Sequence, residues 1–324
     1  MFKRRTLVAA AAAATACGAW PARAQSYPSK PIRLVVGFAA GGPTDLVARA
    51  LAQEMSKTLR EQVVVENRPG ATGRIAEESV ARAPGDGYTL LLDSQTLITN
   101  PLTMSKVLFD PLRDFVPVSR VATLPLILLA SPDLPVKTVK DLVELARSKR
   151  NSVNYGSAGT AGSGHLAGAL LSVTTGVEMT HIPFKGQQPA LAEVMAGRVQ
   201  FIFYAVAGAR EQVTAGKVKA LAVTSPQRLP QFPDVPTMAE AGYPGFEVTT
   251  PWLGLVAPAG TPAEVVKLLH EATRKALEAP DTQQRMNTMG AIAASSTPQE
   301  FSRFLATDFK RWQQLVQRTG IKAE

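Results

Sequence analysis

The chain has 324 residues, of which 45% are hydrophobic and 19% charged, with a formal net charge of +9 and one cysteine. A chain of this size can bury a large core and has room for one or two domains. Its lysines and arginines are scattered, with no dense basic run interleaved with aromatic residues, which argues against nucleic-acid binding and leaves a weak attraction for anionic solutes.

The N-terminus has the pattern of a cleavable export signal. Basic residues at 3–5 precede an apolar run from Leu7 to Ala16, and Ala22-Arg23-Ala24 follows as an A-x-A site. The apolar run is well short of the about 20 residues that a membrane-spanning helix needs. We therefore predict cleavage after Ala24, so that residues 1–24 are a signal peptide and the mature chain is free in the periplasm.

Two features of this segment leave alternatives open. Arg4-Arg5 is compatible with the twin-arginine export route as well as the general route, and Cys17 is compatible with a lipoprotein. The residues before Cys17 lack the leucine of a good lipoprotein signal, so plain cleavage is favoured. Cleavage removes four basic residues and lowers the net charge from +9 to +5. It also removes the only cysteine, which excludes a disulfide, a thiol nucleophile and a cysteine metal site.

The first part of the mature chain alternates apolar strands with amphipathic helices. The predicted order is strand 32–36, helix 44–59, strand 63–65, helix 75–83 and strand 89–92. Such a rhythm is typical of a mostly parallel sheet covered by helices.

The same rhythm restarts at Val153 and ends in a helical tail. Strands are predicted over 153–155, 179–184, 199–204 and 218–223, then a proline-rich connector, a strand at 249–258 and helices that start at Thr261-Pro262 and Thr297-Pro298. Apolar runs at 121–130 and 248–257 are suitable crossing points between two α/β units. We predict a discontinuous lobe 1 over 25–125 and 248–324, and a lobe 2 over 126–247.

Two glycine-rich loops, residues 37–45 and 156–165, each connect a strand to the start of a helix. Helix starts leave N–H groups unpaired and carry a partial positive charge, so they suit an anion. Neither loop has the ending of a phosphate loop. Two such loops facing one cleft would suit a ligand with carboxylates at both ends, and a Cβ at Gly42 or Gly164 is expected to obstruct that ligand while leaving the fold intact. The alternative for the first loop is a tight turn capped by Thr44 or Asp45.

Catalytic residues do not assemble in this sequence. The histidines at 165, 181 and 270 lack the spacing of a zinc site, and neither Ser157 nor Ser163 lies in a nucleophile elbow. His165 is favoured as a buried structural side chain over a ligand contact. We expect no enzymatic activity, no metal and no cofactor.

Motifs spread in order through the mature chain carry a resemblance to a known family. They are YPSKPI at 27–32, the 37–45 loop, ENRPGA at 66–71, DGYT at 86–89, the 155–166 segment, HIPFKG at 181–186 and WxGLxAPxGTP at 252–262. In these motifs the chain resembles the extracytoplasmic receptors of tripartite tricarboxylate transporters, the Bug receptors.

The resemblance implies an α/β type II periplasmic-binding fold, in which two lobes close over a small carboxylate in the cleft between them. It also implies a receptor, expected to be monomeric, that delivers its ligand to the membrane components of such a transporter. A sensor that passes ligand occupancy to a membrane signalling protein stays open as the alternative. An effector-sensing DNA-binding regulator would need a helix-turn-helix module where the signal peptide stands.

The family pattern assigns ligand contacts to both glycine loops and their neighbours. Carried over residue by residue, these are Phe38, Ala39, Gly41, Gly42, Thr44, Asp45, Ser94, Ser157, Ala158, Gly159, Ser163, Gly164, His165 and Lys185.

Tyr204 departs from the family pattern and adds a further candidate contact. The family commonly has Phe-Asp where this chain has Phe203-Tyr204, and without that carboxylate the simplest partner for a ligand ammonium is missing. Tyr204 would offer an aromatic face beside Phe38 and Trp252, or else point into the core. We therefore expect a carboxylate without an amine, aliphatic or aromatic.

Overall fold

The computed structural model describes residues 27–148, 153–160, 162–184 and 186–320. The predicted signal peptide and Lys185 lie outside these residues. Within the described ranges no helix has the length and apolar character to cross a membrane.

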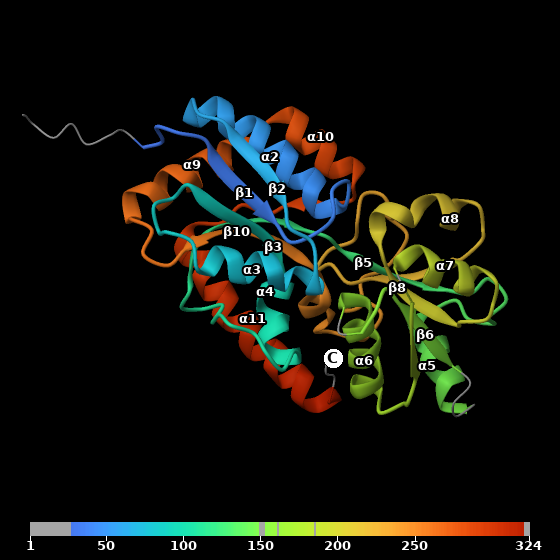
Figure 1. Cartoon of the computed structure of the whole chain (residues 1–324). Coiled ribbons are helices and arrows are strands. Elements are labelled where there is room, and N and C mark those ends of the chain that lie inside the picture. The colour runs from blue at the N-terminus through green and yellow to red at the C-terminus, as the bar shows by residue number, and fades with distance from the viewer. Residues whose placement is uncertain (1–26, 149–152, 161, 185, 321–324) are drawn as a thin grey trace, which may run out of the picture.

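The chain folds into two α/β lobes, each built on its own sheet (Figure 1). The strand order of the first sheet is β11-β4-β10-β3-β1-β2. The elements of this lobe are β1 (Ile32–Val36), α2 (Pro43–Leu59), β2 (Val63–Asn67), the 3-10 turn η1 (Ala71–Gly73), α3 (Arg74–Ala81), β3 (Thr89–Ser94), α4 (Thr96–Thr103), β4 (Phe115–Thr123), β10 (Trp252–Pro258), α9 (Ala263–Glu278), α10 (Pro280–Thr288), β11 (Ile292–Ala293) and α11 (Pro298–Thr319).

The second lobe is formed by the middle of the chain, and its strand order is β7-β6-β8-β5-β9. Its elements are β5 (Leu126–Ala130), α5 (Val139–Ser148), β6 (Asn154–Ser157), α6 (Ser163–Thr175), β7 (Thr180–Pro183), α7 (Gln187–Met195), β8 (Phe201–Ala205), η2 (Val206–Gly208), α8 (Arg210–Thr214) and β9 (Lys219–Val223). A short turn, η3 (Phe246–Thr249), precedes the return to the first sheet.

Both sheets are mixed, and the expectation of mostly parallel sheets is wrong. Four strand pairs, β1–β2, β1–β3, β6–β7 and β6–β8, are parallel. The other five described pairs, which involve β10, β11 or β5, are antiparallel. Strands β5 and β10, which each run antiparallel to both of their neighbours, are those that the chain forms directly after it changes lobe, so they enter their sheets from the waist of the molecule.

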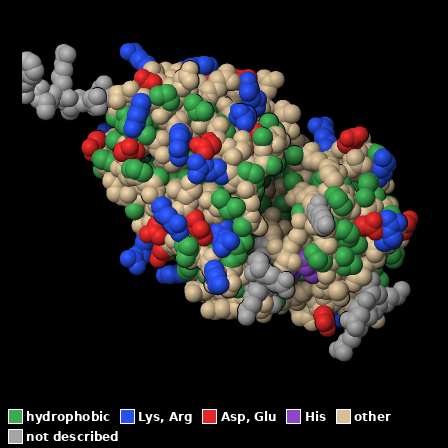
Figure 2. Space-filling model, viewed as in Figure 1, with side chains coloured by type: hydrophobic (Ala, Val, Ile, Leu, Met, Phe, Trp, Pro, Cys, Tyr) green, Lys and Arg blue, Asp and Glu red, His purple; other side chains and the backbone are tan. Residues whose placement is uncertain are grey.

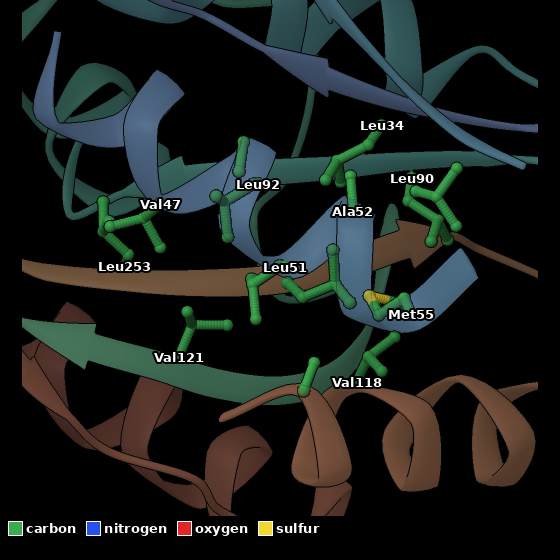
Figure 3. Close-up of a cluster of buried hydrophobic side chains, with 14 of the residues drawn as sticks. Leu34, Val47, Leu51, Ala52, Met55, Leu90, Leu92, Val118, Val121 and Leu253 are labelled. Carbon is green, nitrogen blue, oxygen red and sulfur yellow. The ribbon is translucent and has the colours of Figure 1, made fainter. Parts of the chain in front are cut away.

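The apolar stripe of α2 packs on the first sheet, as its helical spacing predicts. Val47, Leu51 and Met55 are fully buried against Leu34 of β1 and Leu90 of β3 (Figure 3). Helices α9 and α10 complete this layer, while α3, α4 and α11 cover the opposite face. A fully buried leucine or methionine contributes roughly 1.5–3 kcal/mol, so these layers hold the sheet rigidly beneath the loops that it carries.

Hydrogen bonds tie the two chain crossings together at the waist. The Leu124 N–H donates to the Pro251 carbonyl over 2.7 Å. The hydroxyls of Thr224 and Thr250 are buried and 2.8 Å apart, and the Leu126 N–H donates to Thr224 Oγ1 over 3.0 Å. The lobes therefore meet at this hydrogen-bonded waist, and also where α6 packs its apolar side chains against α11.

Helix α11 begins with a capping box that offers a test of local stability. Thr297 Oγ1 accepts from the Glu300 N–H, and Glu300 Oε2 accepts from the Thr297 N–H. We expect Thr297→Ala to lower the free energy of unfolding by about 1 kcal/mol in urea denaturation, because it leaves an end N–H unpaired. Thr307→Ala, at an exposed position inside the same helix, is the control and should change stability by less than about 0.5 kcal/mol. Equal losses would contradict a capping role.

Candidate functional site

A cavity of about 610 Å³ lies between the two lobes, beside the waist. Figure 2 shows the surface hollowed between the two halves of the molecule. The lining residues from the first lobe are Phe38, Thr72, Ser94, Gln95, Thr96, Thr99, Asn100, Thr103 and Met104. Those from the second lobe are Ala158, Gly159, Thr160, Gly162 and Ser163, and Pro251 comes from the waist.

One wall of the cavity is a face of α4. Residues 96, 99, 100, 103 and 104 recur at helical spacing, so their side chains share one side of the helix. Ser94, the last residue of β3, extends this wall, and its Oγ lies 2.9 Å from Thr96 Oγ1. The wall is therefore made mainly of hydroxyl and amide groups.

The opposite wall is the loop that enters α6. Gly162 is the N-cap of α6 and provides no side-chain cap. Gly159 has φ +143°, and a Cβ there would meet no heavy atom within 4 Å, so the backbone is open to the cavity. A helix start of this kind presents N–H groups and a partial positive charge to a ligand.

Charged side chains are absent from the lining within the described part of the chain. The described lining residues can hold an anion through hydroxyls, amides and the α6 N-terminus, as helix starts do for carboxylates and phosphates. The described residues also contain no group of three His, Cys, Asp or Glu side chains that could hold a metal.

A buried pair of acids, Glu77 and Asp93, lies directly behind the α4 wall. Both side chains are 0% exposed. Asp93 Oδ1 accepts from the Ser94 N–H over 2.8 Å and from the Thr96 hydroxyl over 3.1 Å. Asn100 donates its side-chain N–H groups to Glu77 and to the Thr72 carbonyl. Three cavity-lining residues, Ser94, Thr96 and Asn100, are thus held by one acid pair, and Asn100 in turn holds Thr72.

The pair keeps one proton between its two carboxyl groups. Burial, and then the charge of Asp93, raises the pKa of Glu77 to about 10. Burial raises the pKa of Asp93 to about 6, against the opposing effect of its hydrogen bonds to Glu77, Ser94 and Thr96. At neutral pH Glu77 is therefore protonated and Asp93 is ionised.

Two amides of the first glycine loop are paired within the loop itself. The Gly41 N–H donates to Asp45 Oδ2 over 2.8 Å, and the Gly42 N–H donates to the Ala39 carbonyl over 3.3 Å. Although burial opposes it, hydrogen bonds from Arg49, Gly41 and Asn67 hold the pKa of Asp45 below its usual value. Of this loop only Phe38 lines the cavity; Ala39, Gly41, Gly42, Thr44 and Asp45 do not.

The second glycine loop contributes Ala158, Gly159 and Ser163 to the cavity, whereas Ser157, Gly164 and His165 do not line it. A Cβ on Gly164 would lie 2.9 Å from the Phe203 carbonyl oxygen. The expectation that Gly164 tolerates a side chain without disturbing the fold is therefore wrong, because the helix packs there against the backbone of β8.

The histidines of the second lobe are structural neighbours of the site. His165 and His181 stack with ring centroids 3.6 Å apart and planes 6° from parallel. Burial lowers the pKa of each ring to about 4, so both are neutral at physiological pH. Ser157 Oγ lies 2.7 Å from His181 Nε2 and also donates to the Gly159 carbonyl. This contact anchors the loop from behind.

Tyr204 does not supply an aromatic wall. It is 2% exposed, lies in the core of the second lobe, and accepts a 2.7 Å hydrogen bond from Gln188. Trp252 is equally buried and donates to Asp308 over 2.8 Å. Because β8 is a central strand with both faces covered, Tyr204 points into the core, the alternative that strand alternation left open.

Sequence reasoning missed most of the α4 face. It selected Ser94 and passed over Gln95, Thr96, Thr99, Asn100 and Thr103. Pro101 lies inside this short helix and removes an N–H from it, so no helix was predicted there. The available signal was a run of hydroxyl and amide side chains at helical spacing immediately after a buried strand.

Two α/β lobes joined by two chain crossings, with a polar cavity between them that is lined by a helix face from one lobe and a helix start from the other, define a solute-binding protein of the periplasmic type. Residues 47–321 match the family model described as tripartite tricarboxylate transporter family receptor. The chain belongs to this family, whose members are periplasmic receptors rather than enzymes and work with membrane transporter components.

Relatives and solved structures agree with this assignment. The chain is 40% identical to a Pseudomonas sp. (strain P51) protein from the tcbD-tcbE intergenic region, over 99% of this chain and 96% of the relative. It is 35% identical to BugT of Bordetella pertussis, over 95% of both chains. Among solved structures, periplasmic binding protein BugD is 38% identical with a TM-score of 0.76, over 92% of this chain and 100% of that one. An R. palustris protein solved with adipate is 35% identical with a TM-score of 0.78, over 91% and 99%.

The acid pair predicts an unusual dependence of stability on pH. An unfolded Glu77 loses its proton near its ordinary pKa of 4.5, whereas the folded protein keeps it up to about pH 10. The unfolded state therefore binds fewer protons, and stability should fall as pH rises above 4.5, by up to about 1.4 kcal/mol per unit for one proton. Glu77→Gln keeps a donor for Asp93 without a titrating group, so it should flatten this decline between pH 5 and 8 in urea denaturation. The control is Glu178→Gln at an exposed position; an unchanged slope in Glu77→Gln would contradict the shared proton.

Proposed function

We propose that the protein is an exported receptor that captures a small carboxylate without a cationic amine for a tripartite uptake system. The observation that carries this proposal is the cavity itself, which joins hydroxyls and amides on α4 to the uncapped start of α6, with no charged side chain among its described lining residues.

The lining favours a ligand whose charge is negative only. An ammonium buried in the cavity would need a carboxylate partner, and leaving it unpaired costs several kcal/mol. Glu77 and Asp93 are fully buried behind the α4 wall, where they hydrogen-bond to residues of that wall and do not line the cavity. In agreement, adipate and malate, the ligands named for two solved relatives, carry no amine.

The body of the ligand can be aliphatic or aromatic. Phe38, Met104 and Pro251 provide the apolar part of the lining. Since Tyr204 lies in the core, an aromatic ligand would have Phe38 as its aromatic neighbour. A pocket with a few placed polar groups and a modest apolar wall is typical of small-molecule sites.

The remaining parts of the proposal concern processing and domains. We propose that the mature receptor begins at Gln25, acts as a monomer, and divides into lobe 1 (25–125 and 248–324) and lobe 2 (126–247). The change of sheet after β4, and the return to β10, support these boundaries. Uptake rather than signalling is favoured by the family to which the chain belongs.

Calorimetry of the mature protein tests the ligand class. We expect at least one of adipate, malate and phthalate to bind at micromolar concentration, and aspartate and glutamate to bind at least tenfold more weakly, about 1.4 kcal/mol. Micromolar binding of either amino acid would overturn the amine-free proposal. Binding of no carboxylate by folded protein would overturn the receptor assignment for this ligand class.

Two N-cap glycines form a matched pair that tests the location of the site. Gly162 and Gly42 have nearly the same backbone angles, φ −72° and −76°, with ψ 162° and 167°. Only Gly162 lines the cavity. Gly162→Leu should therefore weaken ligand binding at least tenfold, about 1.4 kcal/mol, whereas Gly42→Leu should leave it nearly unchanged. The reverse result would place the ligand on the first glycine loop.

Closure of the lobes is expected on ligand binding. Ligand shifts the population toward the closed form when that form makes the better contacts, and here the contacts come from both lobes. Small-angle scattering should show a smaller radius of gyration for the mature protein at saturating ligand. An identical profile at saturation would contradict closure on binding, or would mean that the ligand-free protein is already closed.

A further inference from the structure

We propose that the α4 wall accepts a hydrogen bond from a hydroxyl group of the ligand, so that the solute is a hydroxycarboxylate. Its carboxylate would lie at the start of α6, and its hydroxyl would donate to the Ser94–Thr96 pair, whose orientation is fixed by Asp93. This inference rests on the proposed function, since it names the kind of carboxylate that the same cavity takes.

The direction of the hydrogen bonds around Asp93 carries the argument. The Thr96 hydroxyl has a single proton, and it donates that proton to Asp93 Oδ1 over 3.1 Å. Ser94 Oγ lies 2.9 Å from Thr96 Oγ1. Because the Thr96 proton is already used, Ser94 must be the donor in this contact. Both hydroxyls therefore turn lone pairs, not protons, toward the cavity.

Glu77 and Asn100 keep Asp93 in its accepting role. The protonated Glu77 carboxyl hydrogen-bonds to Asp93, which supports the ionised form of Asp93. Asn100 fixes Glu77 by donating to both of its oxygens, over 3.0 and 2.9 Å. Because Glu77 and Asp93 are fully buried, water does not compete for these hydrogen bonds. The fold itself therefore fixes which groups of the wall donate and which accept.

Two further groups on this wall are acceptors. Gln95 is 5% exposed and lines the cavity, and its Oε1 is buried without a hydrogen-bond partner among the described residues. Thr103 gives its hydroxyl proton to the Thr99 carbonyl over 2.8 Å, which leaves only lone pairs. An unpaired buried acceptor is costly, so the wall is complete only when a donor reaches it.

The two walls therefore differ in what they bind. A ligand carboxylate placed against Ser94, Thr96 and Thr103 would face lone pairs and the Asp93 charge behind them, whereas the start of α6 offers it N–H groups. A neutral hydroxyl fits the α4 wall, because it supplies the missing proton without bringing a charge that needs a partner. A site built to pair a ligand hydroxyl discriminates strongly against the analogue that lacks it.

Matched pairs of acids test this discrimination in the mature protein. Calorimetry would compare malate with succinate and 4-hydroxybenzoate with benzoate, since each pair differs only by a hydroxyl. In at least one pair we expect the hydroxy acid to bind at least tenfold more tightly. The quantity to compare is the ratio of the affinity for the hydroxy acid to the affinity for its analogue without the hydroxyl. Thr96→Val, which removes the acceptor at nearly constant volume, should reduce this affinity ratio to within about threefold of one. Asp93→Ser should do the same.

The ratio separates recognition from a purely structural role, because a loosened wall would weaken both members of a pair alike. Asp308→Asn is the matched control. Asp308 is a buried acid, 3% exposed, and it accepts a hydrogen bond from Trp252 outside the cavity. The affinity ratio of this variant should therefore stay at the wild-type value. If Asp93→Ser does not fold by circular dichroism, Thr96→Val alone decides the question.

A wild-type ratio near one, or a ratio that survives Thr96→Val, would overturn the inference while leaving the receptor function in place. Binding of other carboxylates with no hydroxy acid among them would do the same. Binding of no carboxylate at all would be the failure of the proposed function, and the inference would fall with it.

Discussion

The waist between the lobes is the constraint on which the rest of the structure depends. Two crossings of the chain run side by side there, held by the Leu124–Pro251 backbone bond and the buried Thr224–Thr250 hydroxyl pair. Because a crossing strand enters its sheet from the waist, β5 and β10 run antiparallel to both of their neighbours. The same joint places Pro251 in the cavity wall and brings the start of α6 opposite the face of α4.

Local sequence patterns predicted the elements whose cause is local. The stripe of Val47, Leu51 and Met55 marks α2 to within one residue of its start, because burial against the sheet requires that spacing. Strand direction was not predictable in the same way, since the apolar run of β10 reads alike whether the strand is parallel or antiparallel. Helix α4 was missed because Pro101 and a polar face hide its periodicity.

The candidate site was likewise predictable only where a local sequence pattern marks it. The α6 loop was found from its glycines, and Ala158, Gly159 and Ser163 do line the cavity. The 37–45 loop has the same composition, yet Asp45 turns back to bind the Gly41 N–H and fills the place of a ligand anion. Whether a loop amide is free thus depends on one side chain's hydrogen bond. The buried Glu77–Asp93 pair depends on contacts between separate elements, which no single stretch of sequence displays.

The described lining of the cavity carries no charged side chain, and this has a consequence for the environment in which the receptor operates. Attraction between exposed charges weakens as ionic strength rises, because counterions screen it over about 10 Å at 0.1 M salt. Short hydrogen bonds from the N–H groups of a helix start inside a cleft are far less exposed to that screening. A receptor outside the cytoplasm meets the salt concentration of its surroundings, and a neutral lining would let it hold an anion with similar strength in dilute and in saline medium.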